Sequence, residues 1–565
     1  MYKALREARD ELTAPGQKFE ITTVEVAGNK VKAFARAPDS LRDIWKSSAR
    51  YATNDYLVYK GERWTYQQAH NQVNSIAGWL TANGVKQYDR VAIAMRNYPE
   101  WMLAYWAITS IGAVAVGMNA WWVPREMEFV LKDSAPDILI CDSERLQRFT
   151  EMQNQFGHLK VVVVRADQEC QNTVDWSDLI TSSQSMPSPL IDPDDDACIM
   201  YTSGTTGKPK GARLTHRGCV NNVFGVMFAS VVQALATSKI RGESSPSSPI
   251  KQQAAAILAT PLFHVTANNC VAQSMTVAGG KLVHMHKWDP GEALRLIEEE
   301  KITTFAGAPV MSREIVSHPE FLARNTSTLK TLGGGGAQVQ PDLVEKIDRN
   351  KGGTQPSQGY GMTETCGGIS ALGGHYFVDK PTSAGLVMPN FEVRCIDENG
   401  NVVPQGARGE ICLRSAQVIK GYLNRPTATS ETIVDGWLHT GDIGYLDEDN
   451  FIYLVDRAKD MVLRGGENVY CSEVEAVLFK NDAIAECAVF SVPDERLGEE
   501  VGAALYLAGD ARLNPDELRE FCSNYLAAYK IPRYIWILEK PLPRNASGKF
   551  VKRELQETLT IDEAE

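Results

Sequence analysis

The stretch "ACIMYTSGTTGKPKG", residues 197–211, places an apolar run directly before a segment of small and basic residues. From Tyr201 to Gly211 there are four Ser or Thr hydroxyls, three glycines and two lysines. Glycine lets backbone N–H groups approach an anion closely, and the hydroxyls and lysines add further donors. The stretch is therefore interpreted as a strand that ends in a phosphate-binding loop.

Two other interpretations of this loop fit the residues less well. A flexible linker is also rich in Gly, Ser and Thr, but it has no need of regularly placed lysines. A Walker loop reads G-x-x-x-x-G-K-[ST]. Here Gly204 and Gly207 are too close together, and Pro209 follows Lys208 where Ser or Thr is required. The sequence therefore predicts a phosphate loop of another kind.

Around this loop the chain alternates between short apolar runs and longer helical patterns. Such alternation is typical of an α/β fold, in which a parallel sheet is covered by helices on both faces. The predicted strands are Arg90–Met95, Asp137–Asp142, Lys160–Arg165, Ala254–Thr260 and Thr303–Pro309. Two polar stretches, Ser182–Asp196 and Ser238–Lys251, are interpreted as loops, the second as an exposed excursion whose role the sequence does not reveal.

One apolar stretch has the length of a membrane span. Residues Leu103–Trp122 are largely apolar, but they contain polar and glycine positions, and their second half, "AVAVGMN", resembles a strand. We expect a buried helix followed by a buried strand here rather than a transmembrane helix.

The residue pattern of the chain changes from about Gly385. A β-rich section follows, in which Asn399–Gly400 between two alternating runs predicts a hairpin. After Asp456 the pattern is helix, strand, strand, helix, strand, enough for a small α+β domain. The predicted organisation is a domain over 1–455 with a β-rich lobe at about 385–455, a hinge at 456–460, and a small domain over 461–565.

The composition excludes some classes of protein. The formal net charge of −12 argues against a general nucleic-acid binder, which needs a basic face. The eleven cysteines include no C-x-x-C pair, and "MYKALREARDELT" lacks an apolar signal core. Reduced thiols in a cytoplasmic protein are the expectation.

Further motifs follow the loop in a fixed order. They are "TPLFHVTA" (260–267), "GGGGA" (333–337), "QGYGMTET" (358–365), "LHTGD" (438–442), "VDRAKDMVLRGGENVYCSEVE" (455–475) and "PLPRNASGK" (541–549). Together with the loop they resemble the adenylate-forming (AMP-binding) superfamily, and within it the acyl-CoA synthetases. The resemblance extends over about residues 41–555.

The resemblance implies a fold and a reaction. The fold would be a large N-terminal domain of two α/β lobes and a β-rich lobe, followed by a small mobile α+β C-terminal domain. A carboxylate would attack the α-phosphate of Mg²⁺·ATP to give an acyl-adenylate, and coenzyme A would then displace AMP. Mg²⁺ is the implied metal, with Thr202 and Glu364 as its ligands, and ATP and coenzyme A are co-substrates.

The resemblance also implies the nucleotide site. Loop residues would hold the β- and γ-phosphates, Tyr360 would stack on adenine, and Asp442 and Arg457 would bind the ribose. Thr363 would contact the α-phosphate, and Glu364 would help to hold Mg²⁺. The complete expected set is Thr202, Ser203, Gly204, Thr205, Thr206, Gly207, Lys208, Lys210, Gly335, Gly336, Ala337, Gln358, Gly359, Tyr360, Gly361, Met362, Thr363, Asp442 and Arg457.

Lys549 is the implied catalytic lysine. It would reach from the small domain to the carboxylate and α-phosphate oxygens, together with the catalytic residues His264, Thr363 and Glu364. For the thiol step the small domain would rotate about Lys459. That rotation would withdraw Lys549 and bring in a passage for coenzyme A formed by Arg464, Gly465, Gly466 and Glu467.

The identity of the acid is the least determined feature. His264 stands where relatives that activate amino acids carry Asp, so an α-amino acid is not expected. The expected acyl pocket is small or apolar and consists of Val265, Thr266, Gly333, Gly334, Cys366 and Gly367. A hydrophobic monocarboxylate follows, with a medium- or long-chain fatty acid first and an aryl acid such as coumarate or benzoate second. Chain length is not determined by the sequence.

Other interpretations remain open at this point. A luciferase-like oxygenase acting on an acyl-adenylate has the same motifs, and so has a non-catalytic nucleotide-binding regulator. Only sixteen residues follow Lys549, without a carrier-domain motif, so coenzyme A is preferred to a carrier-protein thiol. The expected partners are small molecules. No nucleic acid is expected, membrane contact would be peripheral at most, and a homodimer is left open.

Overall fold

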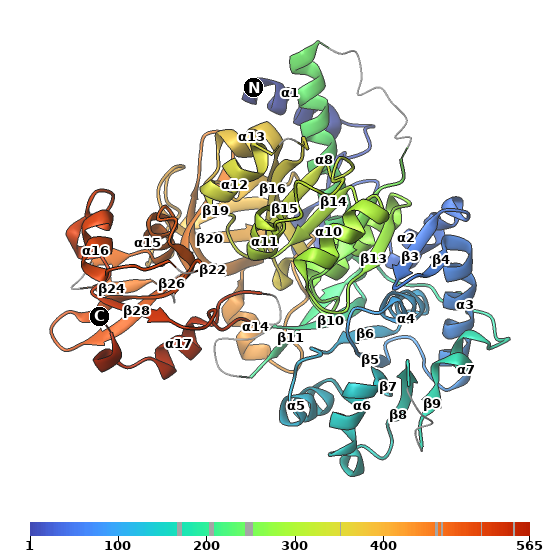
Figure 1. Ribbon diagram of the computed structural model, residues 1–565. Helices are drawn as coiled ribbons and strands as arrows, with labels where there is room; N and C mark the ends of the chain where they lie inside the picture. The colour runs from blue at the N-terminus through green and yellow to red at the C-terminus, as the bar shows by residue number, and fades with distance from the viewer. Residues whose placement is uncertain are drawn as a thin grey trace.

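The computed structural model describes residues 1–166, 172–202, 208–242, 252–350, 352–457, 461–464, 467–509, 511–545 and 548–564. A large mixed α/β body carries a smaller unit at its C-terminal end, which is drawn in orange and red at the left of Figure 1. The large body contains three sheets and the small unit contains a fourth. The predicted α/β class is therefore confirmed, as is a large N-terminal part followed by a smaller C-terminal part.

The first large sheet carries the predicted phosphate loop at its edge. Its strand order is β11-β10-β6-β5-β7-β8-β9, and every pairing is parallel except β10 with β11. The strands are β5 (Arg90–Ala94), β6 (Val114–Gly117), β7 (Ile138–Asp142), β8 (Lys160–Val164), β9 (Val174–Asp175), β10 (Asp196–Thr202) and β11 (Lys210–Thr215). The helices between them are α4 (Pro99–Ser110), α5 (Pro124–Ser134), α6 (Ser143–Thr150) and α7 (Trp176–Ile180).

The second large sheet continues into the β-rich section. Its main path runs β19-β20-β22-β23-β18-β17-β16-β15-β14-β12-β13-β3-β4, with β21 paired to β22. Its α/β half has β3 (Asp55–Tyr59), β4 (Glu62–Thr65), β12 (Ala255–Leu258), β13 (Lys281–His284), β14 (Thr304–Gly307), β15 (Thr331–Gly335) and β16 (Gln355–Met362). Its β-rich half has β17 (Gly367–Gly373), β18 (Gly385–Val387), β19 (Glu392–Ile396), β20 (Gly409–Arg414), β21 (Ile433–Val434), β22 (Trp437–Leu446) and β23 (Phe451–Arg457).

The helices of this half complete the large body. They are α2 (Leu41–Ser47), α3 (Tyr66–Ala82), α8 (His216–Arg241), α9 (Gln273–Val277), α10 (Pro290–Glu299), α11 (Pro309–Ser317), α12 (Pro341–Asp348), α13 (Gly374–Asp379) and α14 (Pro426–Thr432). Before them come α1 (Tyr2–Thr13) and a separate hairpin of β1 (Ile21–Val26) with β2 (Asn29–Phe34). A π-helical segment, Thr266–Ala272, precedes α9.

The predicted hairpin at Asn399–Gly400 is present only in part. Gly400 has the expected positive φ of 82°, and Val403 N–H donates to Cys395 O at 2.9 Å. However, the return arm forms only an isolated bridge, Ile396 with Val402. Pro404 follows and has no N–H to continue the ladder. The partner strand of β19 is β20 instead.

The small unit contains the predicted run of helix, strand, strand, helix and strand, but the two strands before that run and the helix after it were not predicted. Its elements are β24 (Val462–Arg464), β25 (Glu467–Val469), α15 (Cys471–Leu478), β26 (Ile484–Asp494), β27 (Gly498–Leu507), α16 (Pro515–Ser523), β28 (Tyr534–Leu538) and α17 (Lys552–Thr558). The strands form one sheet, β25-β24-β27-β26, with β28 parallel to β27. Its apolar core is separate from that of the large body, which is what a unit able to fold on its own requires.

The long apolar stretches are core elements. Residues 103–122 form the end of α4 and then β6, both fully buried, as expected. Among the described residues, α8 is the one helix whose length and composition would allow it to cross a membrane, and 61% of its apolar window is buried inside the protein. The predicted excursion at 238–251 needs correction, because Ser238–Arg241 are the last turn of α8. Residues 243–251 lie outside the described residues.

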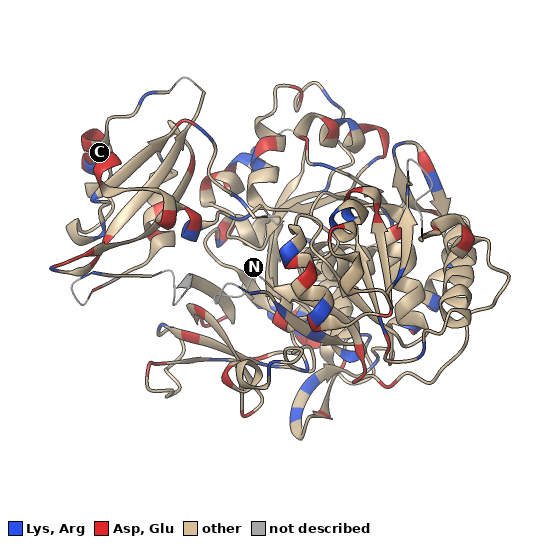
Figure 2. Cartoon of the chain, turned by 90° about the horizontal axis from the view of Figure 1, so that it is seen from below, with Lys and Arg blue, Asp and Glu red and all other residues tan. Residues whose placement is uncertain are grey.

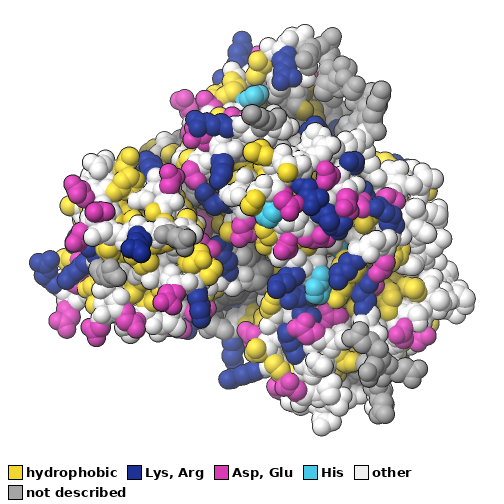
Figure 3. All heavy atoms as spheres, in the orientation of Figure 1, with side chains coloured by type: hydrophobic (Ala, Val, Ile, Leu, Met, Phe, Trp, Pro, Cys, Tyr) yellow, Lys and Arg dark blue, Asp and Glu magenta, His cyan; other side chains and the backbone are white. Residues whose placement is uncertain are grey.

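Charges are mixed along the whole molecule. Lys and Arg alternate with Asp and Glu on both parts of the chain (Figure 2). The face shown in Figure 3 likewise has no continuous basic area. The ten described cysteines are free thiols, nine of them buried.

Candidate functional site

The predicted phosphate loop joins the two strands of an antiparallel hairpin. Thr202, the last residue of β10, lies opposite Lys210, the first residue of β11. Lys208 is exposed, and its ammonium lies 5.4 Å from the centre of the Phe129 ring. Ser203, Gly204, Thr205, Thr206 and Gly207 lie outside the described residues. The hairpin thus delivers a hydroxyl and two ammonium groups to one edge of the first sheet.

Tyr422 connects this hairpin to the predicted magnesium ligand. The ammonium of Lys210 lies 5.1 Å from the centre of the Tyr422 ring. The Tyr422 hydroxyl donates to Glu364 Oε1 at 2.7 Å. Burial and the neighbouring carboxylate raise the pKa of Tyr422, so the hydroxyl stays a donor at neutral pH. Sequence reasoning placed Tyr422 only in a β-rich stretch and missed this contact.

Tyr360 and Asp442 form a buried pair. The residues from Gln358 to Met362 belong to β16, and Thr363 begins the 3-10 turn that carries Glu364. The Tyr360 hydroxyl donates to Asp442 Oδ2 at 2.6 Å, and both residues are more than 90% buried. Arg457 lies opposite Asp442 on β23, although its side chain is outside what the structure describes. Tyr360 therefore orients the carboxylate predicted to bind ribose.

At Gly335 the glycine-rich strand has room for one more side-chain atom beside β16. Gly335 lies opposite Gly359 across the parallel β15–β16 pair, and a Cβ at Gly335 would meet nothing closer than 3.7 Å. Gly336 follows with a φ of +79°, a conformation that favours glycine, and Ala337 comes next. Gln358, by contrast, accepts a hydrogen bond from Val339 N–H at 2.6 Å and is buried. Gln358 thus holds the segment that follows Ala337.

Lys549 reaches this glycine-rich segment from the small unit. A Cβ at Gly336 would lie 3.1 Å from Lys549 Cε and 3.8 Å from its Nζ. The neighbouring Gly548 has a φ of +80°, and a Cβ there would lie 3.0 Å from Cβ of Ala308 in the large body. Asn545 Oδ1 accepts the Lys549 N–H at 3.0 Å and closes the turn. A side chain at residue 548 would push the lysine away from the site.

His264 lies beside the same lysine. Its Nε2 finds no hydrogen-bond partner among the described residues. Burial, and then the positive charge of Lys549, lower the pKa of His264 to about 4. The imidazole is therefore neutral at pH 7 and can sit next to an ammonium without repulsion. A neutral ring can accept or donate a hydrogen bond, but it supplies no charge.

Acid pH should therefore destabilise the fold partly through His264. Unfolded histidine gains a proton near pH 6.5 and the folded residue only near 4, so stability is full above pH 6.5 and falls as the pH drops below it. Between pH 7 and pH 5, the free energy of unfolding should fall by about 2 kcal/mol less in His264→Gln than in the wild type. Urea unfolding at both pH values checks this. An identical pH dependence in wild type and variant would contradict it.

The residues expected around the acyl group lie in two settings. Val265 is buried, and Thr266 Cγ2 would lie 3.8 Å from a Cβ at Gly335, so Thr266 borders the glycine-rich strand. A Cβ at Gly333 would collide with Ser357, and one at Gly334 with Val339 and Pro309. Close packing by itself accounts for these two glycines.

Two asparagines hold the turn that contains Cys366 and Gly367. Asn269 Nδ2 donates to Cys366 O at 2.9 Å, and Asn222 Oδ1 accepts the Gly368 N–H at 2.9 Å. Asn222 comes from α8 and Asn269 from the π-helical segment. Sequence reasoning did not single out either asparagine. Asn269 follows the "TPLFHVTA" motif by two residues, whereas only its position in space links Asn222 to the motifs.

The elements expected to act in the thiol step lie within the small unit. Arg464 and Glu467 are paired across the β24–β25 hairpin. The Arg464 guanidinium donates to both oxygens of Glu500, at 2.7 and 2.8 Å. Gly465 and Gly466, between them, lie outside the described residues, as does Lys459 of the expected hinge. In this arrangement, among the described residues, it is Lys549 of the small unit that lies next to Gly336.

Comparison with known proteins identifies the family. The "AMP-binding enzyme" model matches residues 44–423, and the "AMP-binding enzyme C-terminal domain" model matches residues 473–549. The chain belongs to the AMP-binding enzyme family. It is an adenylate-forming enzyme, an acid–thiol ligase that forms AMP, as the resemblance predicted.

Several relatives of this AMP-binding enzyme are similar over almost their whole length. A feruloyl-CoA synthase from Amycolatopsis sp is 34% identical, covering 88% of this chain and 94% of its own. A long-chain-fatty-acid–CoA ligase from Bacillus subtilis is 30% identical, covering 91% and 93%. The 4-coumarate–CoA ligase 1 of Arabidopsis thaliana is 30% identical, covering 92% of each. Relatives of both predicted substrate types are thus present.

Solved structures have the same architecture. The anthranilate CoA ligase AuaEII with anthranoyl-AMP superposes with a TM-score of 0.82 at 24% identity, covering 92% of this chain and 96% of that one, which shows the fold alone. The o-succinylbenzoate CoA synthetase of Bacillus subtilis, in complex with its acyl-adenylate, has a TM-score of 0.74 at 28% identity, covering 92% and 99%.

Proposed function

We propose that this AMP-binding enzyme joins a hydrophobic monocarboxylic acid to coenzyme A through an acyl-adenylate. The acid's carboxylate oxygen forms a bond to the α-phosphorus of ATP, and the bond from that phosphorus to the bridging oxygen breaks, releasing pyrophosphate. The thiolate of coenzyme A then attacks the acyl carbon, and AMP leaves with the electron pair of the broken C–O bond. The thiol proton passes to solvent.

The observation that carries this proposal is the approach of Lys549 to Gly336 and His264. The ammonium lies beside Gly336, where it would offset negative charge on the carboxylate and the α-phosphate as they come together. Asp442, oriented by Tyr360, would accept hydrogen bonds from both ribose hydroxyls, because a carboxylate has two acceptor oxygens. The site therefore supplies groups for each part of the nucleotide.

Mg²⁺ fits the donors at the hairpin. Glu364 and Thr202 offer oxygen ligands, which Mg²⁺ prefers, and the carboxylate is held in place by Tyr422. When bound there, the ion would offset the charge of the phosphates. Lys210 and Lys208 would contact the β- and γ-phosphates from the end of the same hairpin.

A medium- or long-chain fatty acid is the proposed substrate, and an aryl acid is the second candidate. The 30% identity to a long-chain-fatty-acid–CoA ligase supports the first. The 34% identity to a feruloyl-CoA synthase favours the second. A panel of saturated acids of increasing length, cinnamates and benzoates, with AMP and thioester measured together, tests both. If none of these acids supports the formation of AMP, the proposal is wrong.

Met388 should limit the length of acid that is accepted. Its Sδ lies 2.5 Å from a Cβ position at Gly225, and its Cε lies 3.1 Å from one at Gly368, next to the predicted acyl-pocket residues Cys366 and Gly367. Met388→Ala should raise kcat/KM about tenfold for acids two carbons longer than the wild-type optimum, because each buried CH₂ contributes about 0.8 kcal/mol. The same acid panel measures this. An unchanged length profile would place the acyl chain elsewhere.

A further inference from the structure

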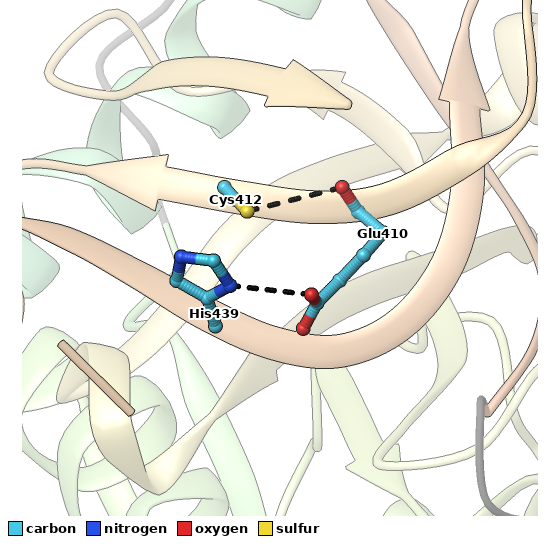
Figure 4. A group of neighbouring side chains, drawn as sticks. All are labelled: Glu410, Cys412 and His439. Atoms are coloured by element: carbon cyan, nitrogen blue, oxygen red, sulfur yellow. Dashed lines mark hydrogen bonds and ion pairs between the residues drawn. The ribbon is translucent and has the colours of Figure 1, made fainter. Parts of the chain in front are cut away.

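Three side chains with metal-binding atoms meet on one face of the β-rich section, outside the nucleotide site (Figure 4). Cys412 on β20 lies directly opposite His439 on β22. Glu410 precedes Cys412 by two residues, so it lies on the same face of the strand, and a bulge between the two shifts it along β22. The pairing of these strands therefore brings the three residues together.

The distances between the three groups are close to those around a single ion. His439 Nδ1 lies 3.2 Å from Glu410 Oε2, and one ligand atom from each residue lies within 4.8 Å of the other two. Ligand atoms around one tetrahedral zinc ion are about 3.3–3.8 Å apart, given metal–ligand distances of about 2.0–2.3 Å. A small rotation of the side chains would bring the three ligand atoms to these distances.

Glu410 is already held for this role. Its Oε1 accepts the Gly441 N–H at 2.9 Å, while Oε2 faces His439. An ion could take Oε2 without breaking the hydrogen bond to Gly441. Cys412 is buried, whereas Glu410 and His439 each expose about a quarter of their side chain, so the ion has a route from solvent. A second-shell partner and an entry path are what a built site needs.

We propose that Glu410, Cys412 and His439 bind one divalent transition-metal ion of the zinc type, with water as the fourth ligand. A thiolate, an imidazole and a carboxylate together favour zinc over Mg²⁺ or Ca²⁺, which prefer oxygen alone. The thiol proton passes to solvent when the ion binds. The thiolate and carboxylate carry two negative charges that match the ion.

The surroundings set limits on the affinity. Arg394, which lies opposite Cys412 on β19, is positively charged and stacks 4.1 Å from the centre of the Trp437 ring. Its charge disfavours a cation nearby but stabilises the thiolate. Asp442 follows His439 by three residues on β22, so a bound ion would also fix the strand that carries the predicted ribose ligand.

The experiment titrates the full-length protein, freed of metal with a chelator, with Zn²⁺ and with Co²⁺. We expect one equivalent to bind, with the Co²⁺ absorption of a tetrahedral thiolate site, and no binding of Mg²⁺ there. Cys412→Ser and His439→Gln should each lower the Zn²⁺ affinity at least about a hundredfold, because losing a ligand costs more than losing an outer-shell partner.

Cys395→Ser is the matched control. Cys395 is a buried cysteine on the neighbouring strand β19, paired with Ile411, and it belongs to the core on the opposite side of the sheet. This variant should bind Zn²⁺ as the wild type does. If Cys412→Ser and His439→Gln bind Zn²⁺ as tightly as wild type, or if Cys395→Ser loses as much affinity as they do, the proposal is wrong. Using two ligand variants keeps the test decisive should one fail to fold.

Discussion

Lys549→Ala should lower the rate of adenylate formation by about 10²–10³-fold, the usual effect of removing one group that stabilises developing charge. The lysine is the charge that the small unit brings to Gly336, 3.8 Å from the glycine's Cβ position. Its loss leaves the α-phosphate and carboxylate oxygens without that ammonium while they react. Acid-dependent exchange of pyrophosphate into ATP measures this step alone.

The second half-reaction gives the contrast. Thioester formation from a synthetic acyl-adenylate and coenzyme A should be largely unaffected, because the proposed mechanism withdraws Lys549 before the thiol arrives. Lys540→Ala, an exposed lysine in the same segment, controls for a general effect of lost charge and should leave both steps unchanged. Equal loss of both half-reactions in Lys549→Ala would show that the two steps share one arrangement of the small unit.

The strand ends of the phosphate loop could be predicted from sequence because their signals are local. An apolar run followed by small donors predicted a strand that ends in a loop, and the structure has β10 ending at Thr202, where that segment begins; β11 was not predicted. The alternation of patterns likewise predicted the α/β class. Periodicity and turn residues report on a few neighbouring positions at a time, and these features need nothing more.

The contacts that assemble the site could not be predicted in this way. Tyr360 and Asp442 are separated by 82 positions, and Tyr422 and Glu364 by 58. Resemblance gave Tyr360 a role toward adenine but not its hydrogen bond to Asp442, since pairing across a sheet depends on register. The continuation of one sheet from the α/β half into the β-rich half was missed for the same reason: sequence does not show which edges meet.

The polar pairs Asn222–Gly368 and Asn269–Cys366 illustrate a further limit. Buried amides are placed by the hydrogen bonds they satisfy, and their partners here are backbone groups that carry no sequence signal. An Asn in an apolar helix gives no indication of its partner. Only the three-dimensional arrangement shows that both asparagines support the turn after Glu364.

Asp442→Ala should cause the second large loss of activity, because it weakens the binding of the nucleotide. If the carboxylate accepts two hydrogen bonds from ribose, removing it costs about 1.5–3 kcal/mol for each. The value of kcat/KM for ATP should therefore fall by about 10²–10⁴-fold, while the KM for the acid changes little. Steady-state kinetics with ATP varied at saturating acid measure this.

Tyr360→Phe separates positioning from direct binding. The variant keeps the flat ring proposed to stack on adenine and removes only the hydroxyl that donates to Asp442 at 2.6 Å. We expect a loss of about 3- to 30-fold in kcat/KM for ATP, since one hydrogen bond contributes about 0.5–1.5 kcal/mol net, or somewhat more to a charged acceptor. Glu398→Ala, an exposed carboxylate in the same part of the chain, should have no effect.

The order of these effects distinguishes two accounts of Asp442. If Asp442 binds the ribose and Tyr360 only orients it, Asp442→Ala must be far worse than Tyr360→Phe, and the double variant must be no worse than Asp442→Ala alone. If Asp442 served only to hold Tyr360 in place, the two single variants would lose equal activity. A deoxyribose analogue of ATP gives a direct test. If wild type uses the analogue poorly, while Asp442→Ala uses the analogue and ATP equally well, the carboxylate lies at the ribose hydroxyls.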